Sequence, residues 1–308
     1  MLNIKYISNA AIDKRLWDSC INDSLYGNIY ATSAYLDNLA TNWDALIVND
    51  YEIIMPIIYR QKYGIKYLYQ PAFLPYVGIF SKSKIDDETT NAFFTALLSF
   101  FKFAEIAFAY PLNFSSKKEK LQITPSNNFV LQLNKSYESL YDNFHEHFKN
   151  GLKKVQKLKL QYSTSTDIKS VINLYKALYS DRIKSITDKD INNFSKLCTV
   201  LQNNNNLAIR NILDNNENVL ASVILLVYKD RLYNILPCVT TEGRRLRAGL
   251  LLFDRIIEEF SDKNFTLDFE GSDIKGIADF YLKMNPENEP FCTIRYNNLS
   301  FPFNLFKR

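Results

Sequence analysis

Leu267-Asp268-Phe269-Glu270-Gly271-Ser272 is the stretch on which the predicted fold depends. Apolar and polar residues alternate from Phe265 to Glu270, which predicts a β-strand. Gly271-Ser272-Asp273 ends that strand, and Asp273 can cap a following helix. The apolar face of that helix is formed by Ile274, Ile277, Phe280, Tyr281 and Met284. Two carboxylates therefore lie near a strand end, where open α/β sheets bind ligands.

The composition is that of an ordinary globular chain. Its 308 residues suffice for one large domain or two of usual size, and 47% of them are hydrophobic. The net charge of +4 is too small to indicate a nucleic-acid-binding protein, so we expect no DNA partner.

The cysteines and the apolar stretches indicate a cytoplasmic protein. Cys20, Cys198, Cys238 and Cys292 are far apart and form no CxxC motif, which favours buried, reduced thiols over disulfides or a metal site. The N-terminus lacks the basic-then-apolar order of a signal peptide. The longest apolar stretch, from Phe93 to Tyr110, is interrupted by two charges, so we expect no membrane span.

The order of predicted elements indicates two mixed α/β domains. The first half reads strand, two helices, hairpin, strand, helix, strand. The second half begins with helices, which are followed by three predicted strands at Leu207 to Asn211, Val219 to Tyr228 and Arg231 to Val239. A polar loop from Thr240 to Arg247 comes next, and then a helix, a strand, a second helix and a last strand. We predict domains at 1–130 and 131–308, and the last strand could also pack against the first domain.

This layout resembles the GNAT (acyl-CoA N-acyltransferase) superfamily, and three segments are similar to its FemAB/FemX-like tandem-GNAT branch. The most specific is Leu267 to Ser272 with Gly276 and Phe280-Tyr281, which resembles that branch's DFEGS…G…FY segment. The others are the basic stretch Phe148 to Val155 and an aromatic stretch, Tyr69 to Phe80, similar to bacterial members. The resemblance implies two tandem GNAT-like domains.

The phosphate-binding motif departs from the family pattern. GNAT enzymes carry Q/R-x-x-G-x-G/A at a helix start, where backbone amides hold the CoA pyrophosphate. Here Arg244 matches the first position and Arg247 stands at the first glycine. The candidate donor-binding residues are Gly243, Arg244, Arg245, Arg247, Ala248 and Gly249. The alternative is a solvated loop whose arginines pair with Glu242, Asp254 or Glu258.

The candidate catalytic residues are Glu270, Tyr281 and Lys283. A carboxylate at a strand end can orient or deprotonate an amine, and Glu270 and Asp268 would share one strand face. Alternatively, either carboxylate binds backbone amides of the next turn, which we favour for Asp268. The FemX-like pattern F-K-x-x-F-G would put a lysine where Tyr281 stands, with Lys283 two residues on.

Other polar and aromatic residues are weaker candidates. Tyr76, Tyr233, Asp268 and Ser272 could contact substrate. Lys149, Lys153 and Lys157 share a helix face that could touch tRNA or a nucleotide phosphate, although such faces are often simply solvated. The only histidines, His145 and His147, would point to different helix faces, so we expect no metal site.

The function expected is therefore N-acyl transfer to a small-molecule amine acceptor. The donor would be acetyl- or acyl-CoA, bound as a substrate rather than as a tight cofactor, or an aminoacyl group on tRNA. Two alternatives stay open: a FemX-like aminoacyl-tRNA-dependent peptidoglycan aminoacyltransferase, and a non-catalytic GNAT-fold protein that binds a phosphate-bearing ligand.

Overall fold

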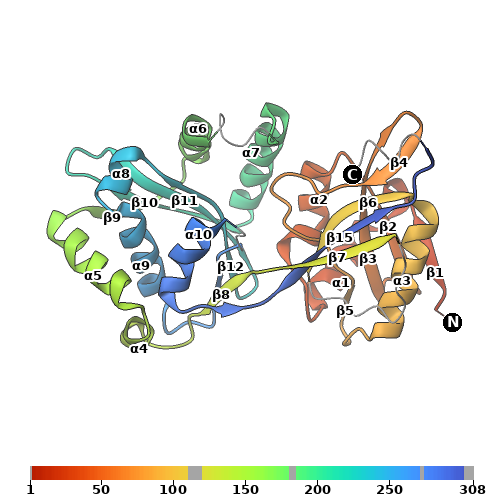
Figure 1. Ribbon diagram of the computed structural model, residues 1–308, viewed down its shortest axis with the longest axis horizontal. Helices are drawn as coiled ribbons and strands as arrows, with labels where there is room; N and C mark the ends of the chain where they lie inside the picture. The colour runs from red at the N-terminus through yellow and green to blue at the C-terminus, as the bar shows by residue number, and fades with distance from the viewer. Residues whose placement is uncertain (1, 110–119, 180–184, 271–273, 302–308) are drawn as a thin grey trace. The chain divides into compact units, whose positions relative to one another are not determined.

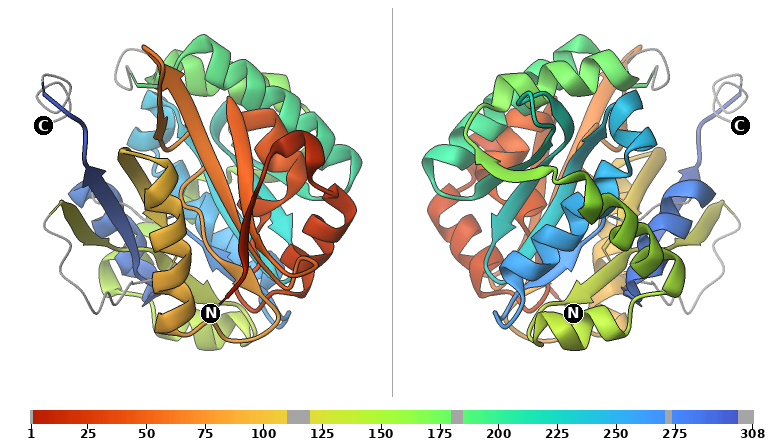
Figure 2. Two further views of the ribbon diagram at one scale, coloured as in Figure 1. Left: turned by 90° about the vertical axis from the view of Figure 1, so that its right-hand side faces the viewer. Right: turned by 90° about the vertical axis from the view of Figure 1, so that its left-hand side faces the viewer.

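Each half of the chain contributes its own sheet. The computed structural model describes residues 2–109, 120–179, 185–270 and 274–301. The chain divides into a first unit, residues 1–126 with 290–308, and a second unit, residues 127–289. Both sheets contain parallel as well as antiparallel pairs and are covered by helices (Figures 1 and 2). The predicted class, mixed α/β with two mixed sheets, is confirmed.

The sheet of the first unit has the strand order β1-β2-β3-β4-β6-β15-β7, and β5 also pairs with β3. Its strands are β1 Ile4–Ile7, β2 Asn42–Val48, β3 Ile53–Lys62, β4 Ile65–Leu68, β5 Phe80–Ser81, β6 Phe103–Phe108, β7 Leu121–Ser126 and β15 Phe291–Asn297. β15 comes from the far end of the chain and lies between β6 and β7, so it completes this sheet.

The predicted hairpin of β2 and β3 is confirmed, but β3 is not an edge strand. It pairs with β2 from Ile53 to Tyr59, with β5 at Ile53 and Ile54, and with β4 from Tyr59 onward. Pro56 falls between the β5 and β4 pairings. A proline therefore fits inside this strand, because it lies where neither β4 nor β5 pairs with it.

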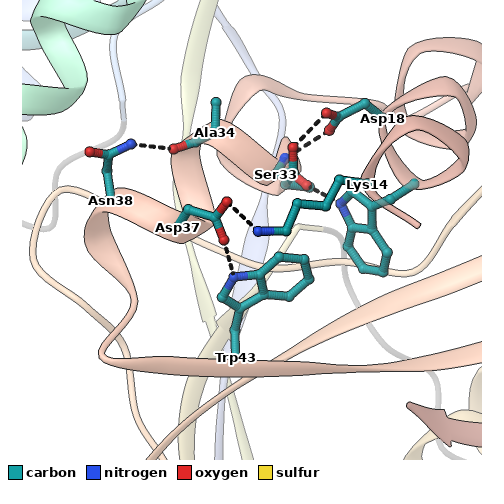
Figure 3. Close-up of polar contacts among 9 residues, drawn as sticks. Lys14, Asp18, Ser33, Ala34, Asp37, Asn38 and Trp43 are labelled. Carbon is teal, nitrogen blue, oxygen red and sulfur yellow. Dashed lines mark hydrogen bonds and ion pairs between the residues drawn. The ribbon is translucent and has the colours of Figure 1, made fainter. Parts of the chain in front are cut away.

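The helices of the first unit are α1 Lys14–Asp23, α2 Ser33–Leu39 and α3 Asp87–Phe100, with short 3-10 turns at Asn9–Ala11 and Ile29–Ala31. Figure 3 shows the polar contacts that join α1 to α2. Asp18 accepts hydrogen bonds from the N–H and the hydroxyl of Ser33, at 2.7 and 2.5 Å. Asp37 accepts from Lys14 at 2.6 Å and from the indole N–H of Trp43 at 3.0 Å, which ties α2 to β2.

The sheet of the second unit has the strand order β14-β8-β13-β12-β11-β10-β9. Its strands are β8 Phe129–Gln132, β9 Gln161–Ser165, β10 Leu207–Leu213, β11 Val219–Tyr228, β12 Arg231–Val239, β13 Thr266–Asp268 and β14 Glu287–Asn288. The three successive strands predicted from residue 207 to residue 239 are confirmed as an antiparallel meander, β10-β11-β12.

The helices of the second unit cover both faces of this sheet, with α6 and α7 on one side and α5 and α9 on the other (Figure 1). They are α4 Tyr137–Asp142, α5 Glu146–Val155, α6 Ile168–Tyr179, α7 Asp188–Asn203, α8 Thr241–Arg245, α9 Ala248–Phe260 and α10 Lys275–Tyr281, with 3-10 turns η3 Gln156–Leu158 and η4 Leu282–Met284.

Helix α9 is the central helix of the second core. Its buried side chains include Leu252, Phe253, Ile256 and Ile257. Burying an aliphatic or aromatic side chain of this size stabilises the fold by roughly 1.5–3 kcal/mol. These contacts hold α9 in place, so its N-terminus is held firmly just past the end of β12.

Three predicted elements differ from those observed. The stretch expected as a loop between Thr240 and Arg247 contains α8, because the Thr240 hydroxyl accepts a hydrogen bond from the Gly243 N–H at 2.9 Å and caps the turn. The strand expected to reach Glu270 ends at Asp268. The N-cap of α10 is Ile274, and Asp273, the expected cap, lies outside the described residues.

The α9 residue Asp254 is a carboxyl group inside the second core. It is 1% exposed and accepts a hydrogen bond from the Tyr137 hydroxyl at 2.6 Å. Burial raises the pKa of Asp254 from 3.8 to about 6. The folded state therefore binds more protons than the unfolded state between these values, and the free energy of unfolding falls as pH rises through this window.

The substitution Asp254→Asn keeps an oxygen that can accept from Tyr137 but does not ionise. We expect it to raise the free energy of unfolding by about 2 to 3 kcal/mol at pH 7 and to leave it nearly unchanged at pH 3.5. Urea denaturation at both pH values measures this. The exposed Asp279→Asn is the control, and an equal effect of Asp254→Asn at both pH values would contradict the assignment.

Candidate active site

The strands β12 and β13 part to form a fork. They pair in parallel only where Arg231 to Tyr233 lie beside Thr266 to Asp268. Beyond this point β12 continues to Val239, whereas β13 ends and the chain goes on to α10. The open fork lies at the carboxyl ends of two parallel strands, where α/β sheets bind ligands.

A bulge in β12 bends the strand at the fork. Ile224 of β11 pairs with Leu236, but the next residue, Leu225, pairs with Asn234, which leaves Ile235 as the extra residue. A bulge of this kind kinks and twists its strand. The bend therefore coincides with the point where β12 leaves β13.

A pocket of about 660 Å³ lies beside the free part of β12. Its size is typical of small-molecule sites. Aromatic and aliphatic side chains make up most of the wall, and its three charged residues within the described chain are all cations. The lining residues are Tyr175, Tyr179, Pro237, Val239, Arg244, Arg247, Gly249, Leu250, Phe253, Gly276, Ile277, Phe280, Tyr281 and Lys283.

One end of the pocket is the N-terminus of α9. Arg247 is the N-cap residue, and its side chain makes no capping hydrogen bond. Its backbone is left-handed, with φ 60° and ψ 29°. This conformation suits glycine and costs other residues about 1 kcal/mol or more. Helix N-terminal N–H groups and two nearby guanidinium groups, of Arg244 and Arg247, make this end suitable for an anion.

Tyr281 forms the wall nearest the base of the fork. It is 4% exposed, stacks on Phe269 with a ring-centroid separation of 4.6 Å, and accepts a hydrogen bond from Asn234 Nδ2 at 2.8 Å. Burial raises the pKa of Tyr281, and the negative charge of Glu270 adds to this effect. Tyr281 is therefore a neutral phenol, and Glu270 lies close enough to influence it.

Residues 143–280 match the family model described as "Acetyltransferase (GNAT) domain". This segment, which makes up most of the second unit, is therefore similar to GNAT acetyltransferase domains. A comparison with curated protein sequences finds no match. The superfamily match supports N-acyl transfer as the function of this chain.

Solved structures show that the tandem-GNAT fold extends over nearly the whole chain. FemX matches with a TM-score of 0.68 at 11% identity, over 98% of this chain and 99% of FemX. The C-terminal domain of a putative lysylphosphatidylglycerol synthetase from Agrobacterium fabrum matches with a TM-score of 0.58 at 10% identity, over 96% of this chain and 94% of that domain. A tandem GNAT protein from the clavulanic acid biosynthesis pathway matches with a TM-score of 0.55 at 8% identity, over 95% of this chain and 98% of that protein. Identities this low establish the fold alone.

The residues predicted from the GNAT phosphate motif divide into two groups. Arg244, Arg247 and Gly249 line the pocket. Arg245 instead pairs with Glu242 through its Nε at 2.8 Å, which is the alternative that the sequence left open. Ala248 is completely buried. The loop thus keeps the backbone conformation that glycine would have at residue 247 while adding a cation to the pocket.

The two carboxylates of the DFEGS-like segment lie in different environments. Asp268 is 0% exposed, and its carboxylate forms an ion pair with Arg231 at 3.2 Å. Burial raises the pKa of Asp268, and the charge of Arg231 opposes this. Glu270 has φ 63°, and its N–H donates to Asp268 Oδ1 at 2.9 Å. The expectation that both share one strand face is wrong, because the strand ends between them.

The other candidate substrate contacts that the structure describes do not line the pocket. Tyr233 is 1% exposed, and the guanidinium carbon of Arg231 lies 5.9 Å from its ring centre. Tyr76 belongs to the first unit, where it is buried beside Tyr30 and Phe291. Ser272 lies outside the described residues.

The basic helix α5 packs against the start of α9. A Cβ atom at Gly151 would lie 2.5 Å from Leu250 and 3.4 Å from the Arg247 guanidinium, so α5 approaches this end of the pocket closely. Lys149 binds the Asp142 carbonyl at 2.9 Å and is mostly covered. The remaining lysines of this stretch, Lys153, Lys154, Lys157 and Lys159, are exposed.

Sequence reasoning missed the residues that other elements bring to the site. Tyr175 and Tyr179, four residues apart on α6, line the pocket because α6 crosses β11 and β12. Asn234 reaches Tyr281 across the fork. The spacing of the tyrosines was a usable signal for a shared helix face, but nothing local to Asn234 distinguishes it from the many other asparagines.

Other kinds of site are not evident among the described residues. They contain no cluster of three or more His, Cys, Asp or Glu that could hold a metal ion. All four cysteines are buried, as predicted, and none of them is in a disulfide. Within the described ranges no helix is long and apolar enough to span a bilayer.

Gly243 positions the whole loop, because a Cβ atom there would lie 2.0 Å from the Leu220 carbonyl oxygen of β11. We expect Gly243→Ala to destabilise the second unit by several kcal/mol, since backbone must move. Gly276→Ala is the matched control: Gly276 also lies in a helix, but a Cβ there meets nothing within 4 Å, so the fold should gain about 0.5–1 kcal/mol from helix propensity. Equal effects in thermal or urea denaturation would contradict this role for Gly243.

Proposed function

We propose that the pocket of the second unit binds an acyl thioester carried on a phosphate-bearing group, such as acyl-CoA, and that the chain transfers the acyl group to a small-molecule amine. The observation that carries this proposal is the composition of the pocket wall. An apolar body ends at two arginines and a helix N-terminus, beside the free part of β12. An amphipathic anion is the ligand that such a wall complements.

Each part of the donor has a complementary surface. Guanidinium groups of Arg244 and Arg247, with the first N–H groups of α9, suit a pyrophosphate. Leu250, Phe253 and Ile277 offer apolar contact for the chain that links phosphate to thioester. Past Tyr233, β12 no longer pairs with β13, so its backbone N–H groups on that side could hold the thioester carbonyl.

The reaction we propose is direct attack of a neutral amine on the thioester carbonyl. The C–N bond forms, the C–S bond breaks, and the amine proton passes to Glu270, directly or through water. The Tyr281 hydroxyl donates a hydrogen bond to the negative charge that develops on the leaving sulfur. Lys283 adds a positive charge at the pocket wall. The donor is a substrate in this scheme, and no tightly bound cofactor is required.

An aminoacyl ester on tRNA is the second candidate donor. Two observations favour it: the likeness to FemX over almost the full chain, and the exposed lysines that follow Gly151 on and after α5. Lys153 and Lys157 could contact RNA phosphates while the esterified end enters the same pocket. Either donor is compatible with a cytoplasmic enzyme. A chain that binds such ligands without turnover is the remaining alternative.

Replacing Glu270 tests the chemistry. We expect Glu270→Gln to lower kcat at least 100-fold and to change the donor KM less than about 3-fold, because Glu270 acts on the acceptor amine. The assay follows thiol release from acetyl-CoA and long-chain acyl-CoA with a panel of amines, and aminoacyl transfer from tRNA in parallel.

Glu242→Gln is the matched control for this substitution, since Glu242 is an exposed glutamate of the same unit that pairs with Arg245. It should retain wild-type kcat. An unchanged kcat for Glu270→Gln would remove Glu270 from the mechanism. Donor binding without any turnover in the wild-type chain would favour the non-catalytic alternative.

A further inference from the structure

Asn234 occupies the base of the fork. It is the first residue of β12 beyond the parallel pairing with β13, and it immediately precedes the bulged Ile235. Its side chain is 2% exposed and crosses to α10, where Nδ2 donates to the Tyr281 hydroxyl oxygen at 2.8 Å. This bond joins the strand that would hold the donor to the helix that carries the pocket tyrosine.

Half of the Asn234 amide does not contribute to this bond. Its Oδ1 atom is buried and has no hydrogen-bond partner among the described residues. A buried acceptor left unpaired costs stability, whereas an apolar side chain of similar size avoids that cost. An asparagine is therefore not the residue that packing and stability alone would favour at this position.

The direction of the hydrogen bond decides where the Tyr281 proton can go. A tyrosine hydroxyl has one proton to donate and can also accept. Because Asn234 donates to the oxygen, the Tyr281 proton is not used in this contact. Phe269 stacks on the ring and Phe253 meets its face edge-on, so the ring itself is held in place.

We infer that Asn234 is a positioning residue for the proposed reaction: it binds the Tyr281 oxygen and thereby directs the hydroxyl proton toward the donor's leaving group in the pocket. The inference rests on the proposed function and concerns the same site. Asn234 is 2% exposed and bonds to the Tyr281 oxygen, so we expect it to act through Tyr281 and not on the substrate.

A double-mutant cycle tests this inference. We expect Asn234→Leu to lower kcat about tenfold with little change in the donor KM, and Tyr281→Phe to lower it at least as much. In the double variant the second substitution should cause no further loss, because both remove the same oriented proton. If Asn234→Leu lowers kcat by the same factor with and without the Tyr281 hydroxyl, the inference is overturned.

Asn211→Leu is the matched control. Asn211 lies in β10 of the same sheet and bonds to the Ser222 hydroxyl at 2.6 Å, away from the pocket. It should keep kcat within about twofold of wild type. A merely structural role for Asn234 predicts that kcat per folded molecule stays at the wild-type value, whereas positioning predicts a tenfold lower kcat at temperatures where Asn234→Leu is fully folded.

A readout that needs no turnover separates this inference from the proposed function. The NMR resonance of the hydroxyl-bearing ring carbon of Tyr281, labelled with ¹³C and identified by its loss in Tyr281→Phe, should shift in Asn234→Leu and stay in place in Asn211→Leu. A wild-type chain without acyl transfer would refute the proposed function. An unmoved resonance in Asn234→Leu would refute the positioning role independently.

Discussion

The buried carboxylate of Asp268 is the constraint on which the site depends. It forms an ion pair with Arg231 of β12 and accepts the Glu270 N–H. Arg231 also pairs with Glu289, at the end of the second unit. Breaking a buried charge pair by removing one partner costs about 3–5 kcal/mol. Asp268 thus holds the last paired residues of β13 and sets the point where the fork opens.

The geometry of the pocket follows from that point. β13 stops, β12 bends at its bulge, and α9 begins just past the end of β12 with its apolar face packed in the core. Two features of this region cost stability: the left-handed backbones at Arg247 and Glu270, and the Asn234 Oδ1 atom, which has no hydrogen-bond partner among the described residues. Strained conformations are common at functional sites, where the surrounding packing stabilises them enough to persist.

The sequence predicted the parts of this account that depend on local patterns. Runs of β-branched and aliphatic residues predicted the bounds of β11 and β12. The resemblance to the GNAT motifs identified Arg244, Arg247 and Tyr281 as candidate site residues. The sequence could not predict that Glu270 turns left-handed, because the apolar-polar alternation continues through Glu270 whereas the observed strand ends at Asp268. Tyr175, Tyr179 and Asn234 reach the site through sheet order and register, which local periodicity does not contain.

The central claim is that the pocket between β12 and α10 binds the acyl donor, and blocking it is the most direct test. Ile277 lines the pocket and is 41% exposed, so Ile277→Trp should fill the cavity without unfolding the chain. Leu282→Trp, at a 49% exposed position outside the pocket wall, is its control. The measurement is the shift in melting temperature caused by acetyl-CoA, long-chain acyl-CoA or aminoacyl-tRNA. We predict a shift for the wild type and Leu282→Trp that Ile277→Trp loses; an equal shift in all three would place the donor elsewhere and contradict the account.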